Sequence, residues 1–313
     1  SNSSTYYSGY GWFGSLMIIE PEKLYKINVQ NGSIAEFTGR PVDAGTKKIP
    51  VVTGWNWIGY LPQKPMSTGS ALSSLSLAEL DYIKNQTNSA TYYSDYGWFG
   101  SLTVMEPNVG YMLKLSNPGT LIYPEPGKSG IEEVKKNNEP AFNPADFEFN
   151  GEIMAKVLIG GAPEGSEEDR LYAFINNEIR GIAGGLYFDA TGTWVYSLLI
   201  YSNQPQGENV TFRYFNAEND EYYSSRDSIT FSNDMIVGNA LNPFKLDFYS
   251  TDANALDSKN RRIEMIAYPN PFDHSVNIEY KIPDLTHVRI SVYDSYGNPV
   301  SMLLDKDIES GHY

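Results

Sequence analysis

Short runs of alternating apolar and polar residues, separated by glycine, proline and asparagine, recur along the chain. Met17–Ile27 and Thr103–Leu115 each divide into two alternating stretches around a proline, a pattern typical of two strands joined by a turn. Ser70–Gln86 differs, because its leucine and isoleucine residues fall on one helical face. The pattern therefore predicts a mainly β chain with one short helix in its N-terminal part, where the helix covers a sheet.

One aromatic string is written twice. Residues 6–16 read YYSGYGWFGSL and residues 92–102 read YYSDYGWFGSL, which gives a repeat of 92 − 6 = 86 residues without a gap. A looser copy, WIGYL, begins at Trp57. In an extended strand Trp57 and Gly59 share one face. We therefore expect each repeated tryptophan, Trp12 and Trp98 included, to pack in a core over a neighbouring glycine.

In a second interpretation, some of these aromatic rings bind a ligand. Aromatic side chains with a polar tip suit half-exposed sheet faces, where a sugar ring can stack on them. Trp55 is the tryptophan we expect to be exposed, and Tyr60, Tyr92 and Tyr93 complete the candidate set for sugar stacking. Regular alternation favours core packing over sugar binding, and both interpretations stay open from the sequence alone.

Composition limits the possible functions. With 313 residues the chain is longer than one usual core, so two or three domains are expected. A formal net charge of −15 repels phosphate backbones, which argues against nucleic-acid binding. The absence of cysteine excludes disulfides and thiolate catalysis, and no apolar run is long enough to span a bilayer.

Catalytic motifs are also missing. The histidines are confined to the last segment, so the rest of the chain has none for a Ser-His-Asp triad or a histidine metal centre. They are His274, His287 and His312. No phosphate-binding, zinc-protease or nucleophile-elbow string occurs. We therefore predict that the chain is not an enzyme and has no cofactor, with calcium as one exception.

The calcium candidate is the acidic stretch FNAENDEYY at residues 215–223. Oxygen ligands at this density are the kind that Ca²⁺ prefers, and the candidates are Asn216, Glu218 and Asp220. Their spacing does not fit an EF-hand. A hairpin tip solvated by water is the alternative, and we favour it over a metal site.

Two stretches resemble modules of secreted bacterial proteins. GWNWIGYLP and MEPNVGYMLKL are similar to a module that recurs, often in tandem, in extracellular bacterial proteins, with Asn108 where that module usually has glycine. The residues AF, E-x-RG and GE-x-x-TF between Ala173 and Phe212 resemble a secreted bacterial β-sandwich domain. Glu178 and Arg180 lie on one strand face there, where they form a structural ion pair or a small polar ligand site.

The last segment resembles the C-terminal sorting domain of type IX secretion cargo. The string YPNPF, followed by VNIEYKIP and VRISVYDSYGNPV, carries this resemblance. The matching residues are Tyr268, Pro269, Asn270, Pro271, Phe272 and Gly297. The resemblance implies export by the type IX machinery to the outside or the outer-membrane surface of a Gram-negative bacterium. The family normally continues for further strands, so we expect this domain to be incomplete at Tyr313 and to leave an open strand edge.

These patterns predict a multidomain string of β-sandwich, Ig-like modules. The expected divisions are a repeat module at 1–124 that begins within a unit, a linker at 125–145, a β-sandwich at 146–250, a linker at 251–264 and a sorting-like domain at 265–313. The predicted function is a non-catalytic structural or adhesive stalk at the cell surface. Two alternatives remain, a carbohydrate-binding or accessory fragment of a larger secreted hydrolase, and a fibre subunit assembled by β-strand addition. Expected partners beyond the secretion machinery are surface glycans or neighbouring copies.

Overall fold

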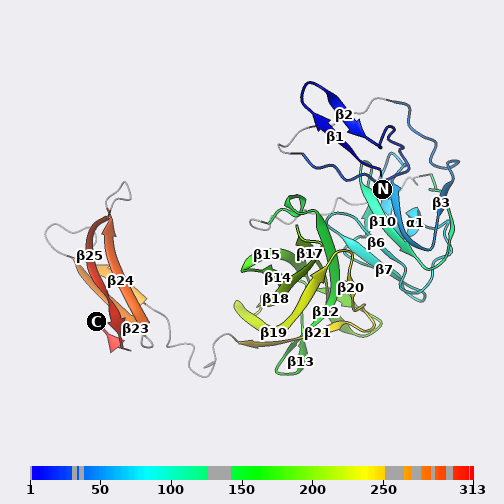
Figure 1. Cartoon of the computed structure of the whole chain (residues 1–313). Coiled ribbons are helices and arrows are strands. Elements are labelled where there is room, and N and C mark those ends of the chain that lie inside the picture. The colour runs from blue at the N-terminus through cyan, green and yellow to red at the C-terminus, as the bar shows by residue number, and fades with distance from the viewer. Residues whose placement is uncertain are drawn as a thin grey trace. The chain divides into compact units, whose positions relative to one another are not determined.

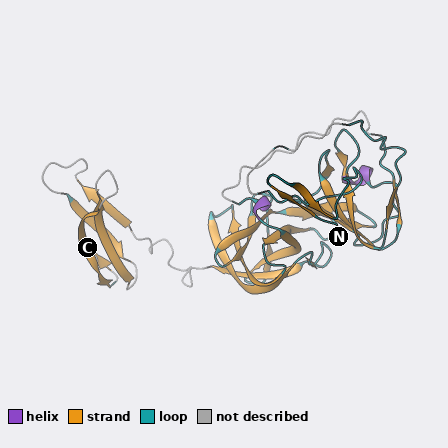
Figure 2. Cartoon of the chain, turned by 45° about the horizontal axis from the view of Figure 1, so that its top comes forward, coloured by secondary structure: helices purple, strands orange, loops and turns teal. Residues whose placement is uncertain are grey.

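The chain is mainly β and is built from several sheets, which confirms the predicted fold class. The computed structural model describes residues 2–29, 34, 39–125, 142–250, 264–268, 276–282, 286–293, 299–309 and 311–313. Figure 2 shows that strands dominate and that helix is confined to short turns. Contacts divide the chain into two compact units, Ser1–Tyr249 and Ser250–Tyr313.

The repeat module occupies residues 2–125 and has a five-stranded sheet at its centre (Figure 1). In spatial order the strands are β4 (Gly54–Gly59), β10 (Gly110–Leu115), β6 (Tyr82–Lys84), β7 (Ser89–Tyr93) and β8 (Gly97–Gly100). Smaller pairs surround the sheet, namely β1 (Ser4–Tyr7) with β2 (Gly11–Gly14), β3 (Ile49–Val51) with β11 (Gly119–Leu121), and β5 (Met66–Ser67) with β9 (Val104–Met105). The core lies over one face of this sheet and includes Ile58, Leu113 and Tyr123.

The helix predicted for Ser70–Gln86 is wrong over most of its length. Only α1 (Thr68–Ala71) is helical, and Tyr82–Lys84 is instead the strand β6. The chain reverses at Leu80, whose φ of 66° lies in the left-handed region and ends any helix there. The carboxylate of Asp81 then accepts hydrogen bonds from the backbone of Ala78 and Ser116, which fixes the reversal. The regular spacing of apolar residues therefore reflects the burial of Leu72, Leu75 and Ile83 in the module core and does not mark a helical face.

The 86-residue repeat is also a structural repeat. In both copies a four-residue turn joins two antiparallel strands in the same register, so that Tyr6 faces Trp12 as Tyr92 faces Trp98. The ring centroids of these two pairs are 5.5 Å and 5.6 Å apart, and both pairs cross at 63°. The hairpin geometry is thus set by its own residues.

The expected packing of each tryptophan over a glycine in a core is wrong. Trp12 is 69% exposed and Trp57 is 45% exposed, and only Trp98 packs against the module core. The glycines instead allow backbone to approach closely. A Cβ atom on Gly14 would lie 2.1 Å from the carbonyl oxygen of Ser3, and one on Gly100 would lie 2.3 Å from that of Ser89.

The second region is one curled sheet of ten strands, which we call the ten-stranded domain. Eight strands run in the order β15 (Glu178–Gly184), β14 (Arg170–Ile175), β18 (Gln206–Asn216), β19 (Glu221–Ser232), β21 (Phe244–Ser250), β12 (Phe149–Ile159), β17 (Thr193–Ser202) and β16 (Leu186–Phe188). The short strands β13 (Ala162–Glu164) and β20 (Ile236–Val237) also pair with β12. Strand β12 runs parallel to β20 and β21 and antiparallel to β13 and β17.

The curl brings β15 back against β17. A Cβ atom on Gly181 would lie 2.3 Å from the carbonyl oxygen of Leu199, so this glycine permits the close approach. The apolar faces then enclose one core, which includes Ile153, Phe212 and Phe231. Strand β18 shows the matching alternation of buried and exposed residues.

The second unit contains two small sheets. One has the order β22 (Glu264–Tyr268), β23 (Asn277–Ile282) and β26 (Gly311–His312), and the other pairs β24 (Thr286–Tyr293) with β25 (Pro299–Ile308). The rings of Tyr280 and Tyr313 stack with centroids 5.4 Å apart, and their backbones exchange two hydrogen bonds of 3.0 Å. Strand β23 lies in the string VNIEYKIP, and β24 includes the first residues of the string VRISVYDSYGNPV.

Candidate functional site

The repeat module and the ten-stranded domain meet at a buried joint, and its polar part is centred on Lys84. This lysine lies at the end of β6 and is 2% exposed. Its ammonium group is 2.6 Å from a carboxylate oxygen of Asp234 and 2.6 Å from the amide oxygen of Asn150, both in the other domain. It also lies 5.5 Å from the centre of the Trp55 ring. Burial lowers the pKa of Lys84, and the bond to Asp234 opposes that change.

A second polar group, Glu152, lies deeper in the same joint. Ser197 donates a hydrogen bond of 2.7 Å to one of its carboxyl oxygens, and the Ser197 hydroxyl is 3.1 Å from that of Ser89 in the repeat module. The other Glu152 oxygen and the Tyr82 hydroxyl are buried with no hydrogen-bond partner among the described residues. Burial raises the pKa of Glu152, because no full counter-charge compensates the loss of water.

The apolar part of the joint is built by the second copy of the repeated hairpin. Its Tyr93 ring is 1% exposed and packs in one cluster with the side chains of Met154, Val195 and Ala240 from the ten-stranded domain. The backbone N–H of Ala240 donates a 2.6 Å hydrogen bond to the Tyr93 hydroxyl. The Phe188 ring centroid lies 4.6 Å from that of Phe99. Burial raises the pKa of Tyr93 to about 12, so the hydroxyl stays protonated near neutral pH.

A second contact lies inside the repeat module, where the end of the first copy meets the sheet of the second. The Gly59 N–H donates a 2.9 Å hydrogen bond to the Glu22 carbonyl, and Lys47 pairs with the Glu22 carboxylate at 2.7 Å. A Cβ atom on Gly59 would lie 2.1 Å from the carbonyl oxygen of Pro21, so only glycine fits. Lys26 lies over the Trp57 ring at 5.4 Å. We call this contact the glycine seat.

The structure separates the four residues predicted to stack on sugars. Tyr60 and Tyr93 are buried and present no ring face to a ligand. Trp55 is partly buried, with Lys84 and Lys114 over its ring at 5.5 Å and 5.8 Å. Tyr92 is partly buried against Trp98. The expectation that Trp55 is the exposed tryptophan is wrong, since Trp12 and Trp57 are the exposed ones.

The remaining predicted residues have structural partners or lie outside the described residues. Asn216 accepts bonds from the backbone of Glu218 and Asn219, so its oxygen caps the turn that also holds Asp220. Within the described ranges, no group of three or more acidic, histidine or cysteine residues gathers to hold a metal ion. Calcium at this turn stays a prediction. Of the sorting motif, Tyr268 ends β22, whereas Pro269, Asn270, Pro271, Phe272 and Gly297 lie outside the described residues.

Glu178 and Arg180 form the expected structural ion pair. Their nearest nitrogen and oxygen are 2.9 Å apart, and the Arg180 guanidinium also lies 4.8 Å from the centre of the Phe147 ring. The arginine is mostly buried beside Glu208, at 4.0 Å. This arrangement holds the edge of β15 to the segment before β12.

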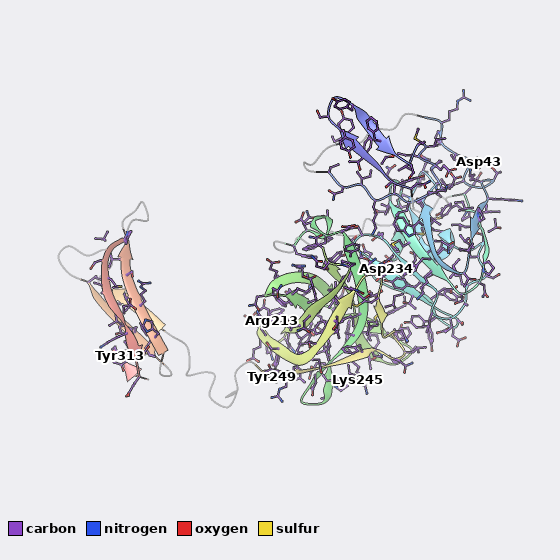
Figure 3. All side chains as sticks on the ribbon, in the orientation of Figure 1. Asp43, Arg213, Asp234, Lys245, Tyr249 and Tyr313 are labelled. Carbon is purple, nitrogen blue, oxygen red and sulfur yellow. The ribbon has the colours of Figure 1, made fainter. Side chains whose placement is uncertain are left out.

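Two open hollows mark the surface of the first unit. One, of about 540 Å³, is bordered by Asp43, Glu125 and several hydroxyl side chains. The other, of about 470 Å³, is bordered by Lys156 and Lys245, which lie opposite each other on β12 and β21. Asp43 and Lys245 are labelled in Figure 3. Neither lining contains a histidine or cysteine, so neither places a nucleophile beside a histidine base.

Sequence reasoning missed the joint, although β17 carried a signal for it. TWVYSLLIYS is buried at eight consecutive positions, which a strand covered on one face only does not show. One face meets the core and the other meets the repeat module.

No protein-family model, no curated protein and no solved structure matches the chain. No helix in the described part of the chain is long and apolar enough to cross a membrane.

Proposed function

We propose that the chain is a non-catalytic modular protein of the bacterial cell surface, which acts as a structural or adhesive stalk. The observation that carries this proposal is the joint, where buried residues of the repeat module and the ten-stranded domain interlock. A stalk must transmit force and hold its modules at a fixed spacing. Flexibly linked modules do not meet this need, whereas a shared core does.

The contacts of the joint suit this role because they combine apolar burial with directional bonds. Tyr93 and Phe188 supply the apolar contact, with ring centroids 5.2 Å apart. The Lys84–Asp234 pair and the Tyr93–Ala240 hydrogen bond fix the orientation. The buried charged pair selects one arrangement of the two domains, since any shift leaves Lys84 buried without its partners.

Export by type IX secretion is part of the proposal and is supported by sequence resemblance. Residues 268–272 read YPNPF, and two pairs of strands follow within the second unit. The test is to express the full chain in a bacterium that has the type IX machinery and in a mutant that lacks it. Surface or culture-medium protein in both strains would contradict this route.

Calorimetry of the intact 313-residue protein tests the stalk. We expect residues of the repeat module and the ten-stranded domain to unfold in one transition, and Lys84→Ala to lower the temperature of that transition. Two independent transitions in the unmodified protein would contradict a rigid joint and remove the support for a stalk.

The carbohydrate-binding alternative now depends on rings other than those selected from the sequence. The exposed rings of the first hairpin, Tyr6, Tyr10 and Trp12, are the group that supports this alternative. Binding of the intact chain to a glycan array, lost in Trp12→Ala, would establish it.

A further inference from the structure

Three chemically complementary groups meet at the polar part of the joint, namely the amine of Lys84, the side-chain amide of Asn150 and the carboxylate of Asp234. The Lys84 nitrogen lies 2.6 Å from the amide oxygen and 2.6 Å from a carboxylate oxygen. The carbonyl carbon of the amide is about 1.23 Å beyond its oxygen, so it lies within about 3.8 Å of the Lys84 nitrogen. Reacting atoms held about 3–3.5 Å apart are close to the geometry of attack. The joint therefore brings a nucleophile, an electrophile and a base together.

Backbone contacts and burial hold these groups in place. The Asp234 N–H donates a 2.9 Å hydrogen bond to the backbone carbonyl of Asn150, and Lys84 donates a 3.2 Å bond to the same carbonyl. Asp234, labelled in Figure 3, is thereby fixed beside the start of β12. The Lys84 side chain is 2% exposed, and the Trp55 ring lies beside its nitrogen. Little freedom remains to be lost before a reaction between these groups.

The charges of the three groups assign their roles. Burial lowers the pKa of Lys84, which favours the neutral amine, and the neutral amine is the form that attacks a carbonyl carbon. An ionised carboxylate is a poor target for an amine, because its carbon is already rich in electrons. Asp234 is therefore the base, within hydrogen-bond reach of the proton that it removes, and the neutral amide of Asn150 is the electrophile.

We propose that Lys84 and Asn150 become joined by an amide bond between their side chains, formed by the chain itself. Lys84 first gives one ammonium proton to Asp234. The neutral nitrogen then attacks the side-chain carbonyl carbon of Asn150, and one of its remaining protons passes to the amide nitrogen. The original carbon–nitrogen bond of that amide breaks, and its electron pair leaves with the nitrogen as ammonia. The proton held by Asp234 departs with the ammonia as ammonium, so Asp234 ends as a carboxylate and no oxidant or cofactor is consumed.

The bond would connect the repeat module to the ten-stranded domain across 66 positions of the chain. A cross-link that closes a long loop stabilises a protein mainly by restricting its unfolded chain, and this chain has no cysteine with which to form a disulfide. The contacts of Lys84 in the structure, and the stability that they supply, are those of the chain before the reaction. Formation of the bond does not depend on whether the chain acts as a stalk.

Mass spectrometry of the intact 313-residue chain tests the bond. We expect the unmodified chain to be lighter than its sequence requires by one ammonia molecule, and protease digestion to yield a branched peptide that joins Lys84 to Asn150. Lys84→Arg and Asn150→Ala should each have the full mass. Asp234→Asn removes the base, so the mass change should appear about a hundredfold more slowly.

Lys114→Arg is the matched control. Lys114 also lies over the Trp55 ring, at 5.8 Å, but its side chain is exposed and has no amide in contact. This variant should still lose ammonia and give the branched peptide.

A competing source of ammonia loss has to be separated from the bond. Asn150 precedes Gly151, and an asparagine before glycine can lose ammonia by reaction with its own backbone. Ammonia loss that persists in Lys84→Arg, without a branched peptide, would identify this side reaction and overturn the proposal. A branched peptide that joins Lys84 to Asp234, with loss of water, would overturn it as well. An unmodified chain of full mass would also overturn it, and that measurement requires no variant to fold.

Discussion

The ammonium group of Lys84 lies 2.6 Å from the carboxylate of Asp234, a residue 150 positions further along the chain. This contact joins β6 of the repeat module to the turn after β19 in the ten-stranded domain. The same ammonium group donates a hydrogen bond to the side-chain oxygen of Asn150, which lies at the start of β12, the first strand of the ten-stranded domain. One buried cation thus ties together three separate parts of the first unit.

Lys84→Ala is expected to lower the free energy of unfolding by about 2 kcal/mol. Removing one member of a fully buried pair costs roughly 3–5 kcal/mol, and the effect here is smaller because the Asp234 side chain is 26% exposed and can recover water. Urea unfolding measures the change. Lys23→Ala is the control. It removes an exposed ion pair between Lys23 and Glu20, and loss of that pair should leave the urea midpoint unchanged. Equal effects of the two variants would contradict the importance of the joint.

Glu152 should make the stability of the first unit depend on pH. Burial raises its pKa in the folded protein above the ordinary value of 4.5. Its contribution to stability is therefore fully present below the unfolded-state pKa and is lost as the pH rises through the folded-state pKa. Glu152→Gln keeps the shape without the charge, so this loss should disappear. Urea midpoints between about pH 5 and pH 8 test it, and parallel curves for the two proteins would contradict it.

The fold class and the repeat could be predicted from the sequence because both depend on local pattern. Alternation along a strand needs no distant partner, and the hairpin register is fixed by a four-residue turn between Tyr7 and Tyr10. The hairpin was therefore reproduced at the 86-residue offset. The prediction of two strands in Met17–Ile27 is wrong, because this segment contains no strand, whereas Thr103–Leu115 contains β9 and β10.

Burial of particular rings could not be predicted, because it depends on residues far away in the chain. Tyr7 and Tyr93 lie in nearly the same string, yet only Tyr93 meets Phe188 of the ten-stranded domain. The string DYIKNQ around Lys84 likewise contains nothing that marks Asp234 as its partner. Leucine spacing over residues 70–86 fits a helix and a buried loop equally well. The positive φ of Leu80 and the pairing of β6 with β10 and β7 exclude the helix, and neither can be read from the spacing.

Gly59→Ala should release the end of the first copy from the glycine seat. The three atoms nearest to an added Cβ all belong to Pro21 and Glu22, so the clash falls on this segment and spares the module core. Hydrogen exchange of residues 20–27 should become faster, with little change in the core strands. Gly39→Ala is the matched control, because nothing lies within 4 Å of its added Cβ. Unchanged exchange in Gly59→Ala would contradict the seat.

His287 in the second unit should titrate above its ordinary pKa of 6.5. Its two ring nitrogens lie 2.8 Å from Asp307 and 2.7 Å from Asp305, and these carboxylates raise the pKa of the ring. Any stability from this pairing is present below the unfolded-state pKa and is lost as the pH rises through the folded-state pKa. NMR titration of the ring, assigned with His287→Gln, measures the value. Asp307→Asn should lower it, and no change would contradict the pairing.

Gly14 and Gly100 offer one substitution at equivalent positions in an exposed and a buried copy of the hairpin. Both have a positive φ, 152° and 148°, and an added Cβ would meet the carbonyl oxygen of Ser3, just before β1, or of Ser89, at the start of β7. Local strain should be the same for Gly14→Ala and Gly100→Ala, at about 1–3 kcal/mol.

Only Gly100→Ala should therefore lower the melting temperature of the first unit, by about 5 °C. Its hairpin belongs to the five-stranded sheet and to the joint, so local strain reduces the stability of the whole unit. The Gly14 hairpin pairs with no other described strand, so its strain should disturb the hairpin alone. Calorimetry reports the first effect, and the fluorescence of Trp12 reports the second. Equal shifts in melting temperature would mean that the first hairpin is as firmly packed as the second, and would contradict the difference in burial between the two copies.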